Sequence, residues 1–221
     1  MCTEPLSERN VALDQILAER RSHRAFTPDV PPRDAISRII HAGLLAPYAA
    51  AAVGGGHEYF RQFFVLEKGS RSLKEASLLL MARVRTLAEE LGHQMENDPA
   101  LRARAESFSR RLAMIRKLGI VPGAGTAPYY LVVAERRGYP PLEHQSLAHC
   151  LENMWLKATA LGLGFQLVSI TSQMSDSPEF CRILGIPPGV WELAGCAVGC
   201  RRETLSPAIR PPVEDVTRWL E

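Results

Sequence analysis

Four short apolar runs that alternate with helical stretches constrain the fold of this chain more than any other feature. Each run is short, is bounded by Gly, Pro or charged residues, and suits one strand of a small sheet. The stretches between them carry apolar residues at helical spacing, so helices must cover the sheet. We therefore expect an α+β fold with a small central sheet flanked by helices. The expected strands are residues 63–66, 129–133, 165–170 and 191–198.

Helices are expected over much of the remaining chain. Pro31-Pro32 opens one of them, Gly92 is expected to close another, and Ser177-Pro178 caps a short one. A tail from residue 207 onward carries a few apolar residues and needs a surface to pack on. We see no internal repeat and no linker, so residues 1–221 are expected to form a single domain. The expected helices are residues 10–20, 31–46, 73–91, 99–115, 142–161 and 178–185.

Composition and charge exclude several classes of protein. The formal net charge of +2 over 221 residues does not indicate a nucleic-acid-binding protein. No apolar run approaches the ~20 residues that span a bilayer, and the first ten residues do not resemble a signal peptide. Five cysteines without CxxC spacing disfavour a disulfide framework or a zinc site, which fits a reducing cytoplasm. We expect no metal site.

Three arginines and a serine lie within the five residues from Arg20 to Arg24, directly after an expected helix. A guanidinium presents fork-shaped donors that match phosphate oxygens, and a serine hydroxyl adds another donor. Such a cluster could neutralise a phosphate monoester without a metal ion. A basic helix end favoured by the helix dipole is the alternative interpretation. The residues alone leave both open.

The order and spacing of several motifs resemble the nitroreductase-like FMN family. The helix that precedes Arg20-Arg21-Ser22-His23-Arg24-Ala25-Phe26, with Ala46-Pro47 some twenty residues on, resembles the opening of that family. Later segments resemble its second core strand, its central helix and break, its closing strand and its tail. These segments are residues 127–133, 145–164, 196–199 and 210–214.

The resemblance implies a fold with a small, mostly antiparallel sheet and a homodimer in which each C-terminal tail wraps onto the partner subunit. It implies that Arg20, Ser22 and Arg24, together with Arg210, hold the phosphate and ribityl chain of FMN. Arg21 would contribute through its backbone or at the isoalloxazine edge. Residues 88–120 would be a helical insertion that serves either as a lid or as extra dimer surface.

The resemblance also implies two further flavin contacts. Pro47, Tyr48 and Ala49 would approach the flavin from the partner subunit, whereas Ile170, Thr171 and Ser172 would line its N5 side. The chain departs from the family in the Ala/Gly-rich stretch 49–56, which lacks the usual asparagine and glutamine. Ala208 stands where many members carry a lysine.

The activity that the resemblance implies is an NAD(P)H-driven, two-step reduction of nitroaromatic compounds, quinones or related small acceptors. NADH or NADPH would be the electron donor, and no side chain is expected to act as a catalyst because the flavin performs the redox chemistry. Dehalogenation, dehydrogenation or flavin breakdown on the same scaffold stays open as an alternative. A non-catalytic flavin-binding protein is the other alternative.

Overall fold

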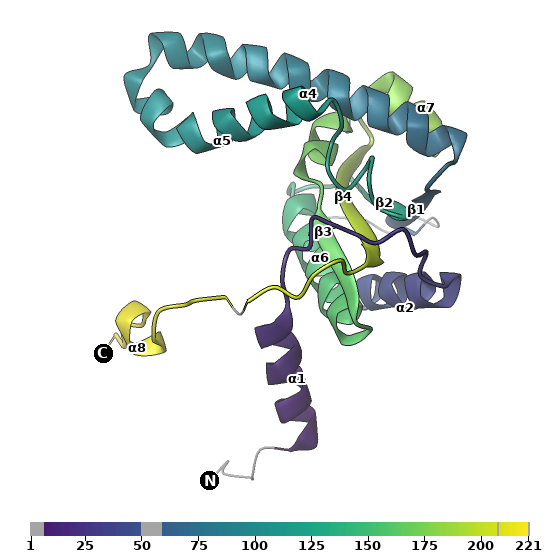
Figure 1. Ribbon diagram of the computed structural model, residues 1–221, viewed down its shortest axis with the longest axis vertical. Coiled ribbons are helices and arrows are strands. Elements are labelled where there is room, and N and C mark those ends of the chain that lie inside the picture. Colours follow the sequence, from purple (N-terminus) through teal and green to yellow (C-terminus); the bar gives the residue numbers. More distant parts are fainter. Residues whose placement is uncertain (1–6, 50–58, 207, 221) are drawn as a thin grey trace.

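The computed structural model describes residues 7–49, 59–206 and 208–220, and it is built around one four-stranded sheet. The strands lie in the order β1-β2-β4-β3, and every neighbouring pair is antiparallel. Figure 1 shows helices on both sides of this sheet. The expected α+β fold with a small antiparallel sheet is therefore confirmed. The strands are β1 (Arg61–Glu67), β2 (Tyr129–Arg136), β3 (Leu163–Leu167) and β4 (Trp191–Cys200).

Three of the described helices begin at a residue whose side chain caps them. The Ser70 hydroxyl accepts a hydrogen bond from the Leu73 N–H, and the Asp98 carboxylate accepts one from the Leu101 N–H. Ser177 does the same for the short helix that begins at Pro178. The helices are α1 (Glu8–Glu19), α2 (Arg33–Leu44), α4 (Arg71–Asn97), α5 (Pro99–Leu118), α6 (Glu143–Ala160), α7 (Pro178–Leu184), α8 (Val213–Val216) and the 3-10 helix η1 (Ser169–Met174).

Side chains of β2 alternate between two cores. Tyr130 and Val132 face the core that α4, α5 and α7 cover, whereas Leu131 and Val133 face the core that α2 and α6 cover. A strand that is buried on both faces has a continuous run of apolar residues, which is why β2 could be recognised in the sequence. The sheet is thus the middle layer of the molecule (Figure 1).

Several expected boundaries are wrong; for example, β2 runs three residues past 133 to Arg136, and α5 ends at Leu118 instead of 115. Helix α4 runs through Gly92 to Asn97, because nothing crowds that glycine and its backbone stays helical. The segment 88–120 therefore begins inside α4, and α4 with α5 forms one long helical hairpin. Strand β3 ends at Leu167 instead of 170, because the chain turns there into η1. Strand β4 extends two residues further than expected, to Cys200.

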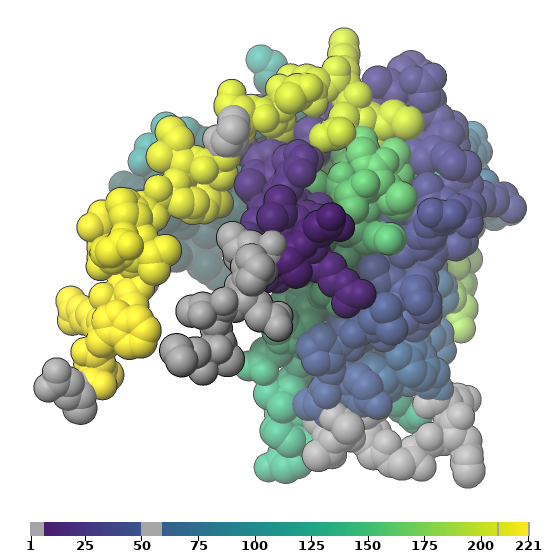
Figure 2. All heavy atoms as spheres, turned by 90° about the horizontal axis from the view of Figure 1, so that it is seen from below, coloured from purple at the N-terminus to yellow at the C-terminus, as the bar shows by residue number. Residues whose placement is uncertain are grey.

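Helix α1 and the C-terminal tail leave their apolar side chains in solvent. No residue of α1 is buried, and Leu13 and Leu17 are each 48% exposed. In the tail, Val213 and Val216 are exposed and Trp219 is 93% exposed. Figures 1 and 2 show the tail extending to one side of the body instead of packing on it. No helix among the described residues is long and apolar enough to cross a membrane.

A buried ion pair joins the first two strands. Arg61 and Glu135 face each other in the β1–β2 register, each 2% exposed, and the guanidinium donates two hydrogen bonds to Glu135 Oε2 at 3.0 and 3.1 Å. Arg61 also donates to the carbonyl of Gly43 at 2.9 Å, which ties the end of α2 to the sheet. Burial raises the pKa of the Glu135 carboxyl, and the Arg61 charge offsets part of that rise.

Replacing Arg61 with methionine is expected to lower the free energy of unfolding by about 3 kcal/mol, because Glu135 and the Gly43 carbonyl lose their buried partner. The double variant Arg61→Met/Glu135→Leu should recover most of that loss. Arg38→Met is the matched control, since Arg38 pairs with Asp34 in solvent and should cost about 0.5 kcal/mol. Urea unfolding measures all three variants. Equal losses for Arg61→Met and Arg38→Met would show that the buried pair has no special structural role.

Candidate functional site

Backbone pairing to the edge of the sheet fixes the segment from Arg20 to Thr27. Ser22 forms a parallel bridge with Phe165 of β3, and the His23 N–H donates to the Phe165 carbonyl at 3.0 Å. Further along, Phe26 pairs with Arg201, and the Thr27 N–H donates to the Cys200 carbonyl at 3.0 Å. The arginine-rich segment is therefore held against the edge of the sheet by backbone hydrogen bonds and is not a free helix end.

The arginines of this segment meet the C-terminal tail in one hollow of about 660 Å³, which we call the arginine hollow. Arg210 lines it although the sequence separates it widely from the segment. The Arg21 guanidinium donates a hydrogen bond to the Ser206 carbonyl, which holds the tail against the segment at this point. Glu203 is the only acidic residue among the described lining residues. The hollow is lined by Arg20, Arg21, Ser22, Arg24, Glu203, Leu205, Ala208, Ile209 and Arg210.

Helix α6 fixes the position of Arg20. The Arg20 Nε lies 3.0 Å from a carboxylate oxygen of Glu152, and its guanidinium carbon lies 4.5 Å from the centre of the Trp155 ring. The Trp155 indole N–H donates to the Arg21 carbonyl at 3.2 Å. Glu152 and Trp155 were not among the site residues predicted from the sequence. Their spacing of three residues puts both on one helix face, which is the signal that could have found them.

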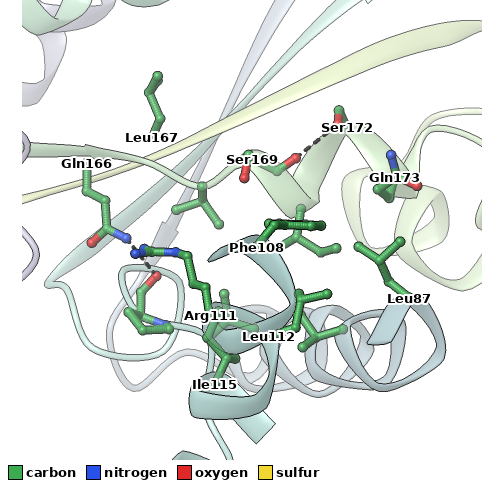
Figure 3. Close-up of a pocket in the computed structure, with 15 residues that line it drawn as sticks. Leu87, Phe108, Arg111, Leu112, Ile115, Gln166, Leu167, Ser169, Ser172 and Gln173 are labelled. Atoms are coloured by element: carbon green, nitrogen blue, oxygen red, sulfur yellow. Dashed lines mark hydrogen bonds between the residues drawn. The ribbon is translucent and has the colours of Figure 1, made fainter. Parts of the chain in front are cut away.

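A central hollow of about 330 Å³ continues from these α6 residues. Glu152 and Trp155 line it on one side, and Leu167 and Ser172 line it on the other. Leu167 and Ser172 also line a third hollow of about 240 Å³ under the α4–α5 hairpin, shown in Figure 3. Shared residues and the Arg20–Glu152 pair thus connect a cationic site, a central hollow and a largely apolar cavity.

The three residues expected beside the flavin N5, Ile170, Thr171 and Ser172, differ in whether their side chains line a hollow. Ile170 and Ser172 line the cavity under the hairpin. Thr171 faces the core instead, where its hydroxyl lies 2.7 Å from the Tyr130 hydroxyl and donates to the Val168 carbonyl at 2.6 Å. Its N–H also donates to that carbonyl. Both donors of Thr171 are thus used inside the fold, so neither is free for a ligand.

Pro47, Tyr48 and Ala49 line a small hollow beside the start of α6 and do not line the arginine hollow of their own chain. The Tyr48 ring packs against the Phe60 ring, with centroids 4.0 Å apart. The rest of the Ala/Gly-rich stretch, residues 50–56, lies outside the described residues. Among the described residues, no cluster of His, Cys, Asp or Glu could hold a metal ion.

His23 lies buried between Ser22 and Arg24. Burial lowers the pKa of its imidazole, and the nearby Arg201 and Arg21 charges add to that effect, whereas Glu203 opposes it. Its Nδ1 is buried and has no hydrogen-bond partner among the described residues. A neutral imidazole here limits the positive charge that the segment must tolerate.

Comparisons with known proteins agree with this geometry. The Nitroreductase family model matches residues 17–200, which is most of the chain. A comparison with curated proteins found no match. Among solved structures, the chain resembles an FMN-bound nitroreductase from Bacteroides fragilis, with 20% identity, a TM-score of 0.66 and coverage of 95% of this chain and 98% of that one.

Two further solved structures show the same likeness over nearly the whole length of both proteins. An FMN-bound nitroreductase from Desulfitobacterium hafniense shares 21% identity, with a TM-score of 0.65 and 95% and 98% coverage. The FMN- and NADPH-dependent nitroreductase NfnB from Sphigopyxis sp. shares 20% identity, with a TM-score of 0.64 and 95% and 99% coverage. Because the family model covers the sheet, α6 and the arginine-rich segment, this chain belongs to the nitroreductase family.

Proposed function

We propose that this protein is an FMN-dependent oxidoreductase that takes electrons from NADH or NADPH and reduces a small acceptor such as a nitroaromatic compound or a quinone. The observation that carries the proposal is the meeting of Arg20, Ser22 and Arg24 with Arg210 in one hollow. Family membership and the FMN-bound neighbours of the same fold support it.

The donor set of the arginine hollow suits a phosphate monoester. Arg20 is paired with Glu152, and the three other guanidinium groups oppose the single Glu203 carboxylate among the described lining residues. Such an excess of cations repels itself unless an anion binds. A phosphate monoester carries about two negative charges at neutral pH and presents three acceptor oxygens. We assign the phosphate to Ser22, Arg24 and Arg210. Arg20 assists from its position between Glu152 and Trp155.

The isoalloxazine ring would then lie in the central hollow, along Leu167 and Ser172. Bound FMN supplies the two-electron redox chemistry, and the protein binds the cofactor, orients it and excludes water. In this arrangement Ser172, which lines both the central hollow and the hollow under the hairpin, would face the ring, and Ile170 would lie on the hairpin side. Thr171 would position both residues through its bonds to Tyr130 and Val168. No side chain of the chain is assigned a catalytic role.

A homodimer would supply a surface that covers the exposed apolar side chains of α1 and of the tail. The exposed apolar side chains of α1 and of the tail would each gain roughly 1.5–3 kcal/mol on full burial, so a partner surface is favoured. We propose that the tail wraps onto a second copy and that Pro47, Tyr48 and Ala49 of each chain reach the flavin of the other. Cys150, Cys181, Cys196 and Cys200 are all free, which supports a cytoplasmic location.

Under argon, NADH or NADPH is expected to bleach the flavin absorbance of the purified protein, because the donor reduces the bound cofactor. Menadione or a nitroarene should then restore the absorbance. Dithionite is the control that shows the flavin is reducible. Bleaching by dithionite without bleaching by either nucleotide would contradict the proposed donor.

Replacing Arg24 with alanine is expected to weaken FMN binding by about tenfold to a hundredfold, because a charge-assisted bond to the phosphate is lost. Arg202→Ala is the matched control, since Arg202 does not line the arginine hollow. FMN titration into the apoprotein, followed by fluorescence quenching, measures both variants. If the two variants lose the same affinity, the phosphate site is misassigned.

Leu13→Glu/Leu17→Glu in α1 is expected to shift the protein from dimer to monomer, because the charges would be buried at the interface without partners. Leu78→Glu on α4 is the control, since Leu78 is also exposed but lies away from α1. Analytical ultracentrifugation reports the state of each variant. A wild-type protein that sediments as a monomer at micromolar concentration would argue against the dimer.

A further inference from the structure

The hollow of about 240 Å³ under the α4–α5 hairpin, which we call the hairpin hollow, suits a single aromatic ring. Pockets that enclose drug-sized ligands are larger, at roughly 300–1,000 Å³. Leu112 and Ile115 of α5 line the hairpin hollow, and so does Ile170 of η1. Phe108 of α5 adds an aromatic ring that is 46% exposed although it lines the hollow. Apolar walls with an aromatic ring favour a flat apolar body as the ligand.

One arginine of α5 brings a positive charge to these apolar walls. Arg111 follows Phe108 by three residues, so both side chains lie on the same face of the helix, and both line the hairpin hollow. Figure 3 shows the Arg111 side chain reaching from α5 toward the β3 segment, well apart from Ser172. A ligand in the hollow therefore meets a guanidinium at one end and Ser172 at the other.

The charge of Arg111 has no counter-ion in the part of the chain that the structure describes. None of the ion pairs there involves Arg111, and none of the described residues that line the hollow is acidic. The positions three and four residues away from it on α5 carry no carboxylate. Arg83 of α4, by contrast, pairs with Glu90 at 3.1 Å. A guanidinium beside apolar walls attracts an anion more strongly than it would in bulk water.

The hairpin hollow lies next to the place proposed for the isoalloxazine ring. Leu167 and Ser172 line both the hairpin hollow and the central hollow. A ligand whose charged end lies at Arg111 would therefore extend its other end toward the flavin.

We propose that the electron acceptor is a one-ring nitroarene or quinone that carries a carboxylate, and that Arg111 selects it over neutral acceptors. The inference rests on the proposed function and deepens it by naming the class of acceptor. The carboxylate would accept hydrogen bonds from Arg111, and the ring would pack against Phe108. The reducible group would lie at the Ser172 end, beside the flavin.

The carboxylate takes no part in the redox step. NADH or NADPH together with one proton supplies two electrons and two protons. In a nitroarene, one N–O bond breaks, that oxygen leaves as water and a nitroso group remains. In a quinone, the two carbonyl oxygens each gain a hydrogen and a hydroquinone forms.

The probes are 4-nitrobenzoate and 4-nitrobenzamide, which share the ring and the nitro group and differ in the negative charge. Each is titrated calorimetrically into the flavin-loaded protein without an electron donor, so that FMN already fills the arginine hollow and the anion is not drawn there. We expect 4-nitrobenzoate to bind about fivefold more tightly than 4-nitrobenzamide at low ionic strength. The preference should shrink as salt is added, because Arg111 is exposed.

Three variants assign the preference to Arg111. Arg111→Gln should bring the two affinities within about twofold of each other, whereas Arg111→Lys, which keeps the charge, should retain most of the preference. Arg110→Gln is the matched control, because it removes the same charge from the neighbouring residue outside the hollow and should leave the preference unchanged. With an electron donor present, the ratio of kcat/KM for the two probes should follow the same order. A ratio within each variant cancels any general loss of activity or stability.

Equal affinities of the two probes for the wild-type protein would overturn the inference, as would an equal loss of preference in Arg111→Gln and Arg110→Gln. The titration needs no donor, so it tests the inference even if neither nucleotide reduces the flavin. Bleaching by a nucleotide without a preference for 4-nitrobenzoate contradicts the inference alone. A preference that depends on Arg111 without bleaching by either nucleotide contradicts the proposed electron donor alone.

Discussion

The pairing of residues 22–27 with the edge of the sheet is the constraint on which the rest of the site depends. Two glycines make it possible. A Cβ on Gly199 would lie 2.8 Å from the Phe26 ring, and a Cβ on Gly164 would lie 3.1 Å from the Cβ of His23. Because β3 and β4 leave this space, the segment lies close against the sheet and holds its arginines where the returning tail reaches them. Residues that follow the first helix and residues of the C-terminal tail thus lie together in one cationic site.

Much of this arrangement could be predicted from the sequence, because it follows from local patterns. Apolar runs and their spacing identify the strands and most helices, and the arginine cluster lines the hollow that Arg210 also reaches. The errors arise where tertiary contacts override local signals. Gly92 was expected to end a helix, but it lies inside the long helix α4, which packs against α5. Thr171 points inward because Gly195 leaves room for its hydroxyl: a Cβ on that glycine would lie 2.1 Å from it. The buried partners Arg61 and Glu135 are 74 residues apart, and neither shows a local signal.

The character of the site changes along its length in a way that matches a ligand with a charged tail and an apolar ring. The arginine hollow is cationic, the central hollow mixes Glu152 and Trp155 with apolar residues, and the hollow under the α4–α5 hairpin is mostly apolar. Arg20 links the first two because it contacts Glu152 and Trp155 while lining the arginine hollow. The helical hairpin gives the chain its own cavity beside the segment that would face the flavin.

A comparison of FMN with riboflavin tests the central claim most directly, because the two differ only in the phosphate. Isothermal titration of each into the apoprotein gives the two dissociation constants. If the arginine hollow binds the phosphate, FMN should bind at least about a hundredfold more tightly than riboflavin, and the difference should shrink as ionic strength rises. Equal affinities for FMN and riboflavin would mean that the converging arginines do not bind the cofactor, and the flavin assignment would have to be abandoned.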